Sequence, residues 1–232
     1  MRVPIAFRDH IARAFRQSPL AGNRRAIVWT SLLASMTGVG GLLMLVQGNP
    51  APRIDGLALS MPVAAQGPSH VESIYRTRQD LDSQRWDGIV IHHSGSTFGS
   101  AASIAEEHER QGILGLGYHF VIGNGHGSED GELHVGFRWL DQLPGAHTAG
   151  PEGDYYNQRY IGICLVGDGD RRPFTDAQMQ RLIELTSSLG DQLDIPIDRI
   201  TLHREIASVT SPGRLFPQSG FEIRLANAIA DD

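Results

Sequence analysis

The sequence predicts an α/β fold: a central mixed β-sheet flanked by helices, in a single domain behind an N-terminal transmembrane helix. Two observations lead to this class. In the C-terminal part, short apolar runs bounded by turn residues alternate with longer segments of helical apolar period. The chain of 232 residues also exceeds a typical domain of roughly 100 to 200 residues. The excess lies at the N-terminus, where an uncharged apolar stretch precedes a proline-rich segment.

The apolar stretch, residues 26–46, contains no charged side chain. At a helical rise of about 1.5 Å per residue it spans roughly 31 Å, about the hydrocarbon thickness of a bilayer. Residues 1–25 hold six arginines and one acid, a charge of +5, so the positive-inside rule keeps them cytoplasmic. We expect a single-pass anchor in the inner membrane, with the rest of the chain extracytoplasmic. If the segment is instead a cleaved signal, the protein is secreted.

Residues 47–69 have the composition of a tether. They hold four of the twelve prolines, with Ala, Gly and Ser between them, and lack the patterned apolar residues that a folded unit needs. The globular domain is therefore predicted for residues 70–232. Once the N-terminal +5 is set apart from the formal net charge of −6, the remainder carries −11. This acidic balance argues against a nucleic-acid partner.

Four segments of the globular part are predicted as strands from their apolar runs. Gly88–His92 opens onto a Ser-Gly-Ser turn, and Tyr118–Ile122 ends in Gly-Asn-Gly. Leu133–Val135 is short. Tyr160–Val166 is a continuous apolar run typical of a buried strand, and it contains the single cysteine, Cys164. We expect a buried thiol there, and one cysteine allows no intramolecular disulfide.

The helices are predicted from their start and stop signals. A first helix covers Ala101–Gln111 and is closed by Gly112. Thr175 and Gln178 form a capping box ahead of an apolar stripe that should face the sheet. Ser219 and Glu222 repeat that pattern after Pro217.

Histidines dominate the chemistry of the sequence, because seven of the ten lie between His92 and His147. His92 and His93 end a strand and must face opposite sides of it, so only one of them is expected as a ligand. The other is interpreted as a packed or hydrogen-bonded neighbour. His203 returns far along the chain, shortly before Ser211-Pro212-Gly213. Ligands at the ends of different strands suit a tetrahedral zinc ion, although the neutral hydroxyl of Ser211 is a poor zinc ligand.

Other polar residues allow two interpretations each. Tyr118 either packs in its strand or donates a hydrogen bond to a developing oxyanion. His147 lies in a loop of small residues that would let a ligand approach the backbone, or it is an ordinary exposed histidine. Tyr155, Tyr156 and Asn157 offer stacking and hydrogen bonds to a sugar, or form a solvated loop.

Several separated motifs recur in the order found in the type 2 N-acetylmuramoyl-L-alanine amidases, and the chain resembles this superfamily from about Trp86 to Pro217. The superfamily is shared by phage amidase lysozymes and peptidoglycan recognition proteins. The motifs are Val90-Ile91-His92-His93-Ser94, Gly117-Tyr118-His119-Phe120, Gly145-Ala146-His147, Ile161-Gly162-Ile163-Cys164-Leu165-Val166-Gly167, Phe174-Thr175 and Leu202-His203-Arg204-Glu205.

The resemblance implies zinc-dependent hydrolysis of the amide between N-acetylmuramic acid and L-alanine in peptidoglycan. By motif, His92 and His203 correspond to zinc ligands and Tyr118 to the catalytic tyrosine. Ser211 stands at the third ligand position, where the family commonly has cysteine. The residues expected at the substrate are His93, His147 and Asn157. Glu205 is interpreted either as a carboxylate that orients a ligand histidine or as an exposed residue.

Two functions therefore compete. An enzyme would recruit a substitute ligand, with His126, His147 or a water held by Ser211 as candidates, and would cleave peptidoglycan or muropeptides. A binding module would keep the groove and lose the metal. Because His92, His203 and Tyr118 are all retained, the sequence favours the enzyme. Hydrolysis of a different amide is a third possibility.

Overall fold

The computed structural model describes residues 56–59 and 68–230 of the chain. Both belong to one compact unit, Ile54–Asp232. The predicted basic N-terminus and the apolar segment 26–46 lie outside the described residues. Within the part that is described, none of the helices has the length and apolar character needed to cross a bilayer.

The described domain is built on a six-stranded mixed sheet with the strand order β1-β4-β3-β5-β2-β6. Strands β3, β5, β2 and β6 run parallel to one another, with β6 at one edge of the sheet. Strand β4 pairs antiparallel with β3, and β1 pairs antiparallel with β4 at the other edge. The predicted α/β class with a mixed sheet is confirmed. The strands are β1 (Gly56–Leu59), β2 (Gly88–His93), β3 (Phe120–Ile122), β4 (Leu133–Gly136), β5 (Tyr160–Leu165) and β6 (Ile200–Leu202).

The edge strand β1 departs from the prediction, because Gly56–Leu59 lies inside the segment 47–69 that we expected to be a tether. It pairs with β4 from Gly56 opposite Gly136 to Leu59 opposite Leu133. The free backbone groups of an edge strand accept any extended segment that reaches them. Composition alone does not reveal such a partner.

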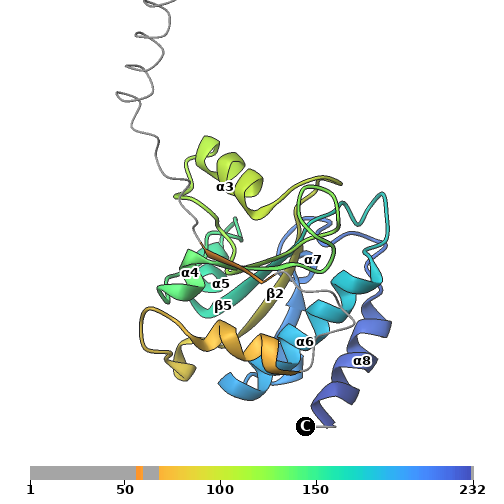
Figure 1. The fold of residues 1–232 in the computed structure, drawn as a ribbon. Coiled ribbons are helices and arrows are strands. Elements are labelled where there is room, and N and C mark those ends of the chain that lie inside the picture. Colours follow the sequence, from red (N-terminus) through yellow and green to blue (C-terminus); the bar gives the residue numbers. More distant parts are fainter. Residues whose placement is uncertain (1–55, 60–67, 231–232) are drawn as a thin grey trace, which may run out of the picture. The chain divides into compact units, whose positions relative to one another are not determined.

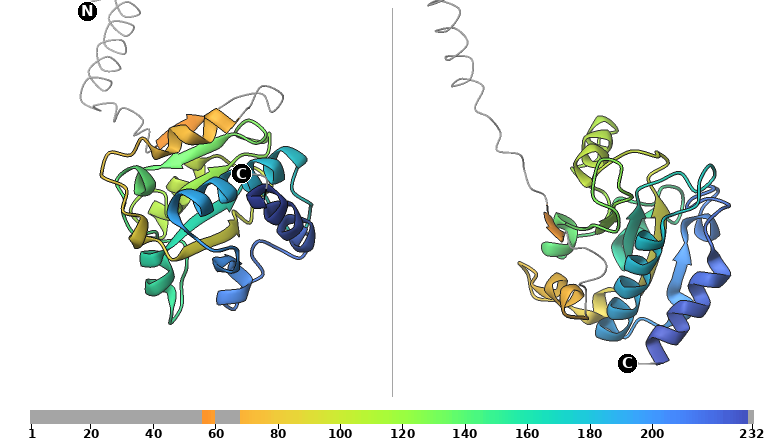
Figure 2. Two further views of the ribbon diagram at one scale, coloured as in Figure 1. Left: turned by 90° about the horizontal axis from the view of Figure 1, so that it is seen from below. Right: turned by 45° about the vertical axis from the view of Figure 1, so that its right-hand side comes forward.

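Alternation along the inner strands divides the core into two faces. Ile89 and Ile91 of β2 point into the larger cluster, which α6 (Asp176–Leu193) and α8 (Gln218–Ala230) cover. On the other face, Cys164 of β5 packs in a smaller cluster beneath α3 (Ala101–Arg110). The ribbon shows α3 on the opposite side of the sheet from α6 and α8 (Figure 1), and α6 and α8 lie side by side (Figure 2). The expected burial of Cys164 is confirmed.

Helix α6 starts where its capping box predicts. The Thr175 hydroxyl accepts a hydrogen bond from the Gln178 N–H, and the Gln178 side chain accepts one from the Thr175 N–H. The prediction for α8 was wrong in register, because the helix begins at Gln218 and places Ser219 inside its first turn. The N–H of Phe221 donates to the carbonyl of Pro217, so the backbone after proline starts the helix without a serine cap.

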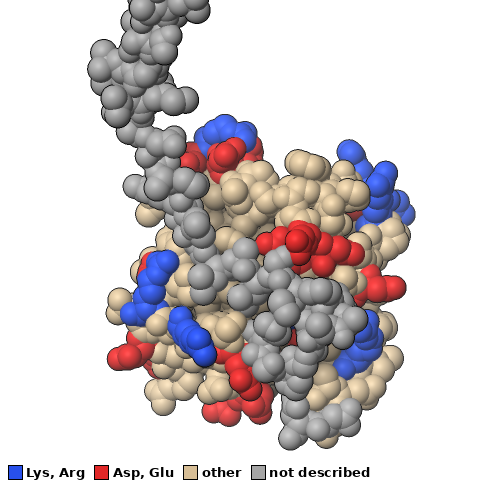
Figure 3. Space-filling view, viewed as in Figure 1, with Lys and Arg blue, Asp and Glu red and all other residues tan. Residues whose placement is uncertain are grey.

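Short helical turns connect the remaining elements: η2 (Pro68–Tyr75), η3 (Ser83–Arg85), α4 (Phe137–Leu140), α5 (Gly153–Arg159), η4 (Ile197–Arg199) and α7 (His203–Ile206). Helix α7 follows β6 without an intervening residue. On the face shown in Figure 3, acidic and arginine side chains are interspersed over the described surface.

Strand β3 begins two residues later than predicted, so Tyr118 and His119 precede it. Because Tyr118 lies outside the strand, its side chain need not point to the same face of the sheet as that of Phe120. It packs against the smaller cluster, on the opposite side of the sheet from Phe120, which belongs to the larger one. This placement brings the Tyr118 ring to the side of the sheet that carries the histidines.

Candidate active site

Two of the predicted histidines meet at the carboxyl end of the parallel strands. His92 lies near the end of β2, and His203 directly follows β6, which pairs with β2 in parallel. Parallel neighbours bring their carboxyl ends to one edge of the sheet, which is where open α/β sheets bind ligands. The two ring centroids are 4.3 Å apart, and the His92 side chain is buried.

A third imidazole, His147, joins them from the loop before α5. Its Nδ1 lies 3.1 Å from Nε2 of His92 and 3.0 Å from the Thr148 hydroxyl, and its Nε2 lies 3.1 Å from the Tyr160 carbonyl. The ring fits because two neighbours have no side chain. A Cβ on Gly162 would come within 2.4 Å of the His147 ring, and one on Gly145 within 2.3 Å.

Asn157 fastens the loop that carries His147. Its Oδ1 accepts hydrogen bonds from the backbone N–H groups of His147 and Thr148, and its Nδ2 donates to the Thr148 carbonyl. The Asn157 carbonyl also accepts from the N–H of Gly145. The Asn157 amide is thus engaged within the protein as a support for His147, and its predicted place at the substrate stays a prediction.

Arg138 joins two segments near the site, and no pattern in the sequence singles it out. Its guanidinium donates to the carbonyls of Leu114, Leu116 and Pro144. Arginine's planar fork suits such convergent acceptors. One side chain therefore ties the segment that leads to Tyr118 to the segment that leads to His147.

Tyr118 lies beside the histidines, with its ring centroid 5.2 Å from that of His92. Burial, with the Cys164 thiol as a secondary cause, raises the pKa of Tyr118 well above the usual value of 10. The phenol therefore stays protonated at neutral pH and can donate a hydrogen bond.

The three imidazoles are neutral at pH 7. Burial lowers the pKa of His92 well below 6.5, and the nearby His147 and His203 add to the effect. Burial also lowers the pKa of His147 to about 3 and that of His203 to about 4. Each ring therefore keeps one nitrogen lone pair that can accept a hydrogen bond or bind a cation.

The fit to a metal ion is partial. The Nε2 atom of His203 is buried without a hydrogen-bond partner in the described structure, which suits a nitrogen that awaits a cation. The Ser211 hydroxyl, by contrast, accepts a hydrogen bond from the His93 N–H at 3.0 Å. Among residues 56–59 and 68–230, no three His, Cys, Asp or Glu side chains are grouped so as to hold a metal. His92 and His203 thus fit zinc as two donors, with a neutral hydroxyl in place of a third.

His93 faces away from the cluster, as strand alternation requires. Its Nδ1 accepts a hydrogen bond from the Gly169 N–H, and the Pro212 backbone is a second hydrogen-bond partner. The ring thereby links two loops, in agreement with the interpretation as a hydrogen-bonded neighbour. Its assignment to the substrate stays a prediction.

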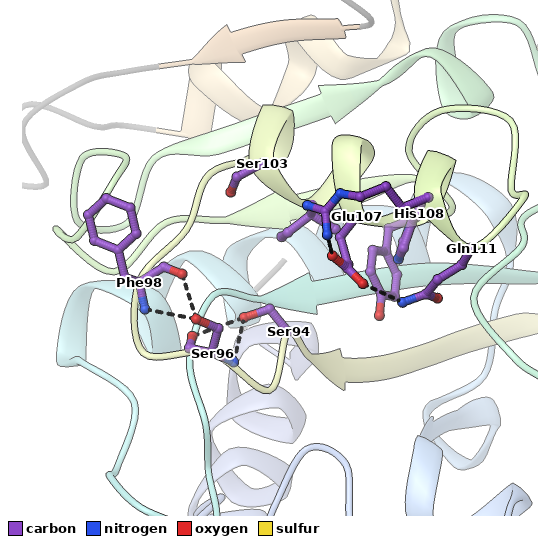
Figure 4. A pocket seen from close by; sticks show the side chains of 10 residues that line it. Ser94, Ser96, Phe98, Ser103, Glu107, His108 and Gln111 are labelled. Carbon is purple, nitrogen blue, oxygen red and sulfur yellow. Dashed lines mark hydrogen bonds and ion pairs between the residues drawn. The ribbon is translucent and has the colours of Figure 1, made fainter.

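A pocket of about 530 Å³ opens beside Tyr118. One wall is the polar side of α3, and the other is the loop that follows β2 (Figure 4). Glu107 accepts hydrogen bonds from Arg110 and Gln111 on the α3 wall. No motif marks the α3 residues, so sequence reasoning missed them. The lining residues are Ser94, Ser96, Phe98, Ser103, Ile104, Glu107, His108, Arg110, Gln111 and Tyr118.

Other candidates lie elsewhere. His126 lines a separate pocket of about 220 Å³, so His147 is the alternative imidazole that reaches His92. The hydroxyl of Tyr155 donates to Asp87. The Glu205 carboxylate accepts from the Leu202 N–H, the Thr201 hydroxyl and the Gln218 amide. Glu205 therefore caps α7, because the first backbone N–H groups of a helix have no partner within it. None of these three hydrogen bonds comes from a histidine.

Comparison with known proteins defines the class. The family model described as N-acetylmuramoyl-L-alanine amidase matches residues 82–214, more than half of the chain. The protein therefore belongs to the N-acetylmuramoyl-L-alanine amidase family, and the resemblance drawn from its motifs is confirmed.

Particular relatives agree with this class. The chain is 33% identical over 135 residues to the endolysin of Escherichia phage T7, covering 54% of this chain and 80% of the endolysin. It is 35% identical over 135 residues to the endolysin of Enterobacteria phage T3, with the same coverage. It also resembles the solved endolysin N-acetylmuramoyl-L-alanine amidase LysCS from Clostridium intestinale URNW, with a TM-score of 0.53 and 27% identity over 66% of this chain and 91% of that one. The enzyme class expected from the sequence is the class of the family.

Proposed function

We propose that this protein hydrolyses the amide between N-acetylmuramic acid and the L-alanine of the stem peptide in peptidoglycan. The observation that carries the proposal is the meeting of His92, His203 and Tyr118, with Tyr118 lining an adjacent pocket, in a chain that belongs to the amidase family. A pocket of about 530 Å³ is of the size that binds small ligands, and its hydroxyl, amide and charged groups suit a sugar or a short peptide.

The proposal includes zinc. His92 and His203 would hold the ion, with the Ser211 hydroxyl at the third position. When bound there, zinc would supply Lewis acidity toward the scissile carbonyl and lower the pKa of water toward 7.

The chain's own groups account for the remaining chemistry. The Tyr118 phenol, kept protonated by its raised pKa, donates a hydrogen bond to the oxygen that becomes negatively charged in the tetrahedral intermediate. The pocket beside it holds the part of the substrate that flanks the amide. Burial of His92 keeps water away from one side of the reacting centre.

Recognition of peptidoglycan without hydrolysis is the second candidate, and one observation favours it. The Ser211 hydroxyl is already engaged by the backbone of His93, and a neutral hydroxyl binds zinc weakly. A domain that lost its metal would still present the pocket and the Tyr118 phenol to a muropeptide.

The two candidates are separated by one experiment on the full chain purified in detergent. Bound zinc is measured by elemental analysis, and the protein is incubated with muropeptides while release of intact stem peptide is followed by mass spectrometry. Hydrolysis predicts release that stops with a chelator and resumes with added zinc. Retention on peptidoglycan with no released peptide, at saturating zinc, would establish the binding module instead.

We also propose that residues 26–46 anchor the protein in the inner membrane with the domain on the extracytoplasmic side, where peptidoglycan lies. The support is the uncharged length of the segment and the arginine-rich residues before it. Fractionation of cells that express the full chain tests this proposal. We expect the protein in the membrane fraction, and we expect added protease to digest it only after the outer membrane has been permeabilised. A shortened protein released from the membrane would indicate cleavage.

A further inference from the structure

We propose that His147 is a positioning residue. Its Nδ1 accepts a hydrogen bond from the Nε2–H group of His92, which leaves the lone pair of His92 on Nδ1. The catalytic importance of this arrangement rests on the proposed function. The hydrogen-bond pattern itself depends only on the chain's own residues.

The argument starts at the Tyr160 carbonyl, which lies 3.1 Å from Nε2 of His147. A carbonyl oxygen only accepts hydrogen bonds, so this nitrogen must carry the proton. In a neutral imidazole the other nitrogen is then an acceptor. Nδ1 of His147 is therefore the unprotonated atom.

Two groups approach this acceptor. Nε2 of His92 lies 3.1 Å from it, and the Thr148 hydroxyl lies 3.0 Å from it. Nδ1 of His147 carries no hydrogen, so an unprotonated Nε2 of His92 would set two lone pairs against each other at 3.1 Å. Nε2 of His92 must therefore donate, and the Thr148 hydroxyl shares the same acceptor. Nε2 of His92 accordingly carries its proton, and in the neutral ring the lone pair remains on Nδ1. That lone pair is the one available to a cation.

The surroundings forbid the alternative orientation of the His147 ring. A flip about χ2 would place carbon atoms against the Tyr160 carbonyl and against His92, which removes all three hydrogen bonds. Gly145 and Gly162 contact the ring so closely that a Cβ at either position would collide with it. Asn157 fixes the backbone of the same loop by three side-chain hydrogen bonds. The ring is thus held in one place by its close contact with two glycines and by its backbone.

This assignment separates His147 from the substrate. We expected it in the substrate groove, but its side chain is buried and both ring nitrogens have protein partners. It also separates His147 from the proposed zinc ligands, because the unprotonated Nδ1 of His147 already accepts a hydrogen bond from His92. Partners that orient a metal-binding histidine in this way typically change metal affinity or activity by about 10- to 100-fold when removed.

Two substitutions distinguish the acceptor from the donor. In His147→Asn, the amide oxygen takes the place of Nδ1 and can still accept from His92. In His147→Gln, the amide nitrogen takes the place of Nε2 and can donate to Tyr160, but the acceptor is lost. The two side chains are both neutral amides, so each serves as the matched control of the other.

The test uses the metal-free full chain in detergent micelles, labelled with ¹⁵N at histidine, with the His92 signals assigned by their loss in His92→Gln. We expect the Nε2–H tautomer of His92 in the wild type and in His147→Asn, and a mixture of tautomers in His147→Gln. Zinc affinity, measured by competition with a chelating dye, should fall about 10- to 100-fold in His147→Gln and much less in His147→Asn.

An Nδ1–H tautomer of His92 in the wild type would overturn the proposal, as would equal effects of the two substitutions. These readouts do not require turnover. If the tautomer is as expected and no muropeptide is cleaved, the proposed function fails while the positioning role stands.

Discussion

At the scale of single residues, Ser211 is the main departure from a complete metal site. Its hydroxyl accepts a hydrogen bond from the His93 N–H and is nearly buried. A thiolate in the same place would accept that hydrogen bond and add a strong zinc ligand. Under the proposed function, the chemistry of this one side chain would decide how tightly His92 and His203 hold zinc.

Ser211→Cys should raise zinc affinity by about a hundredfold, because one of four ligands contributes on the order of 3 kcal/mol of the total binding free energy. Equilibrium dialysis against a zinc buffer measures the change. Ser211→Ala is the matched control and should not tighten binding. Unchanged affinity in the cysteine variant would contradict the ligand assignment.

Tyr118→Phe should lower kcat on muropeptides by roughly 10²-fold, because it removes a donor to the developing oxyanion, while leaving zinc content unchanged. Tyr156→Phe is the control: its ring packs on Tyr155 and Tyr160, away from the histidines. Steady-state kinetics on both variants decide the matter, and a kcat for Tyr118→Phe equal to that of the control would exclude the catalytic role.

At the scale of elements, the site depends on how closely a loop approaches the sheet. Strand β5 has Gly162 at the point where the His147 loop crosses it, and the His147 ring lies where a side chain at that position would be. Helix α3 forms one wall of the pocket, and the capping box at Ser100 fixes where the helix starts. Strand periodicity predicts β5, but not which loop lies on it.

Gly162→Ala should destabilise the domain by about 1–3 kcal/mol, the typical cost of overpacking, because the new Cβ would lie 2.4 Å from Cδ2 of His147. It should also reduce hydrolysis by displacing that ring. Gly99→Ala is the control, since the nearest atom to its Cβ is 3.4 Å away. Urea denaturation measures both variants, and similar unfolding free energies for the two would show that the His147 loop yields easily.

At the scale of the whole molecule, buried histidines couple folding to pH. His119 is fully buried, and its Nδ1 accepts a hydrogen bond from the Gly162 N–H. Burial, reinforced by His147, lowers the pKa of His119 well below 6.5. Below pH 6.5 the unfolded chain therefore binds a proton that the folded chain does not, so stability is present above pH 6.5 and is lost as the pH falls.

Each such histidine should reduce the free energy of unfolding by about 1.4 kcal/mol per pH unit below 6.5. His119→Asn, whose amide oxygen can still accept from Gly162, should make the decline shallower by one histidine's share. Denaturation of the metal-free protein from pH 8 to pH 4.5 measures the slopes. Parallel slopes for variant and wild type would show that His119 does not contribute.

The local pattern of the sequence was sufficient for most of the fold. Apolar runs predict β2, β4 and β5 within one residue, and the Thr175 capping box predicts the start of α6. These features depend on neighbours in the chain, so a sequence displays them directly. The start of α8 and the strand β1 were missed, because a proline entry and an edge pairing carry no comparable local signal.

The sequence by itself determined the family, through motifs that place His92, Tyr118 and His203 in order. It also identified Ser211 as a poor zinc ligand at the third predicted ligand position. Only the tertiary structure decided that His147 reaches His92, that the Asn157 amide binds the loop that carries His147, and that α3 forms a pocket wall. Motifs report which groups are present. Contacts between a loop and a distant strand depend instead on shape, here on two glycines that leave room for one ring.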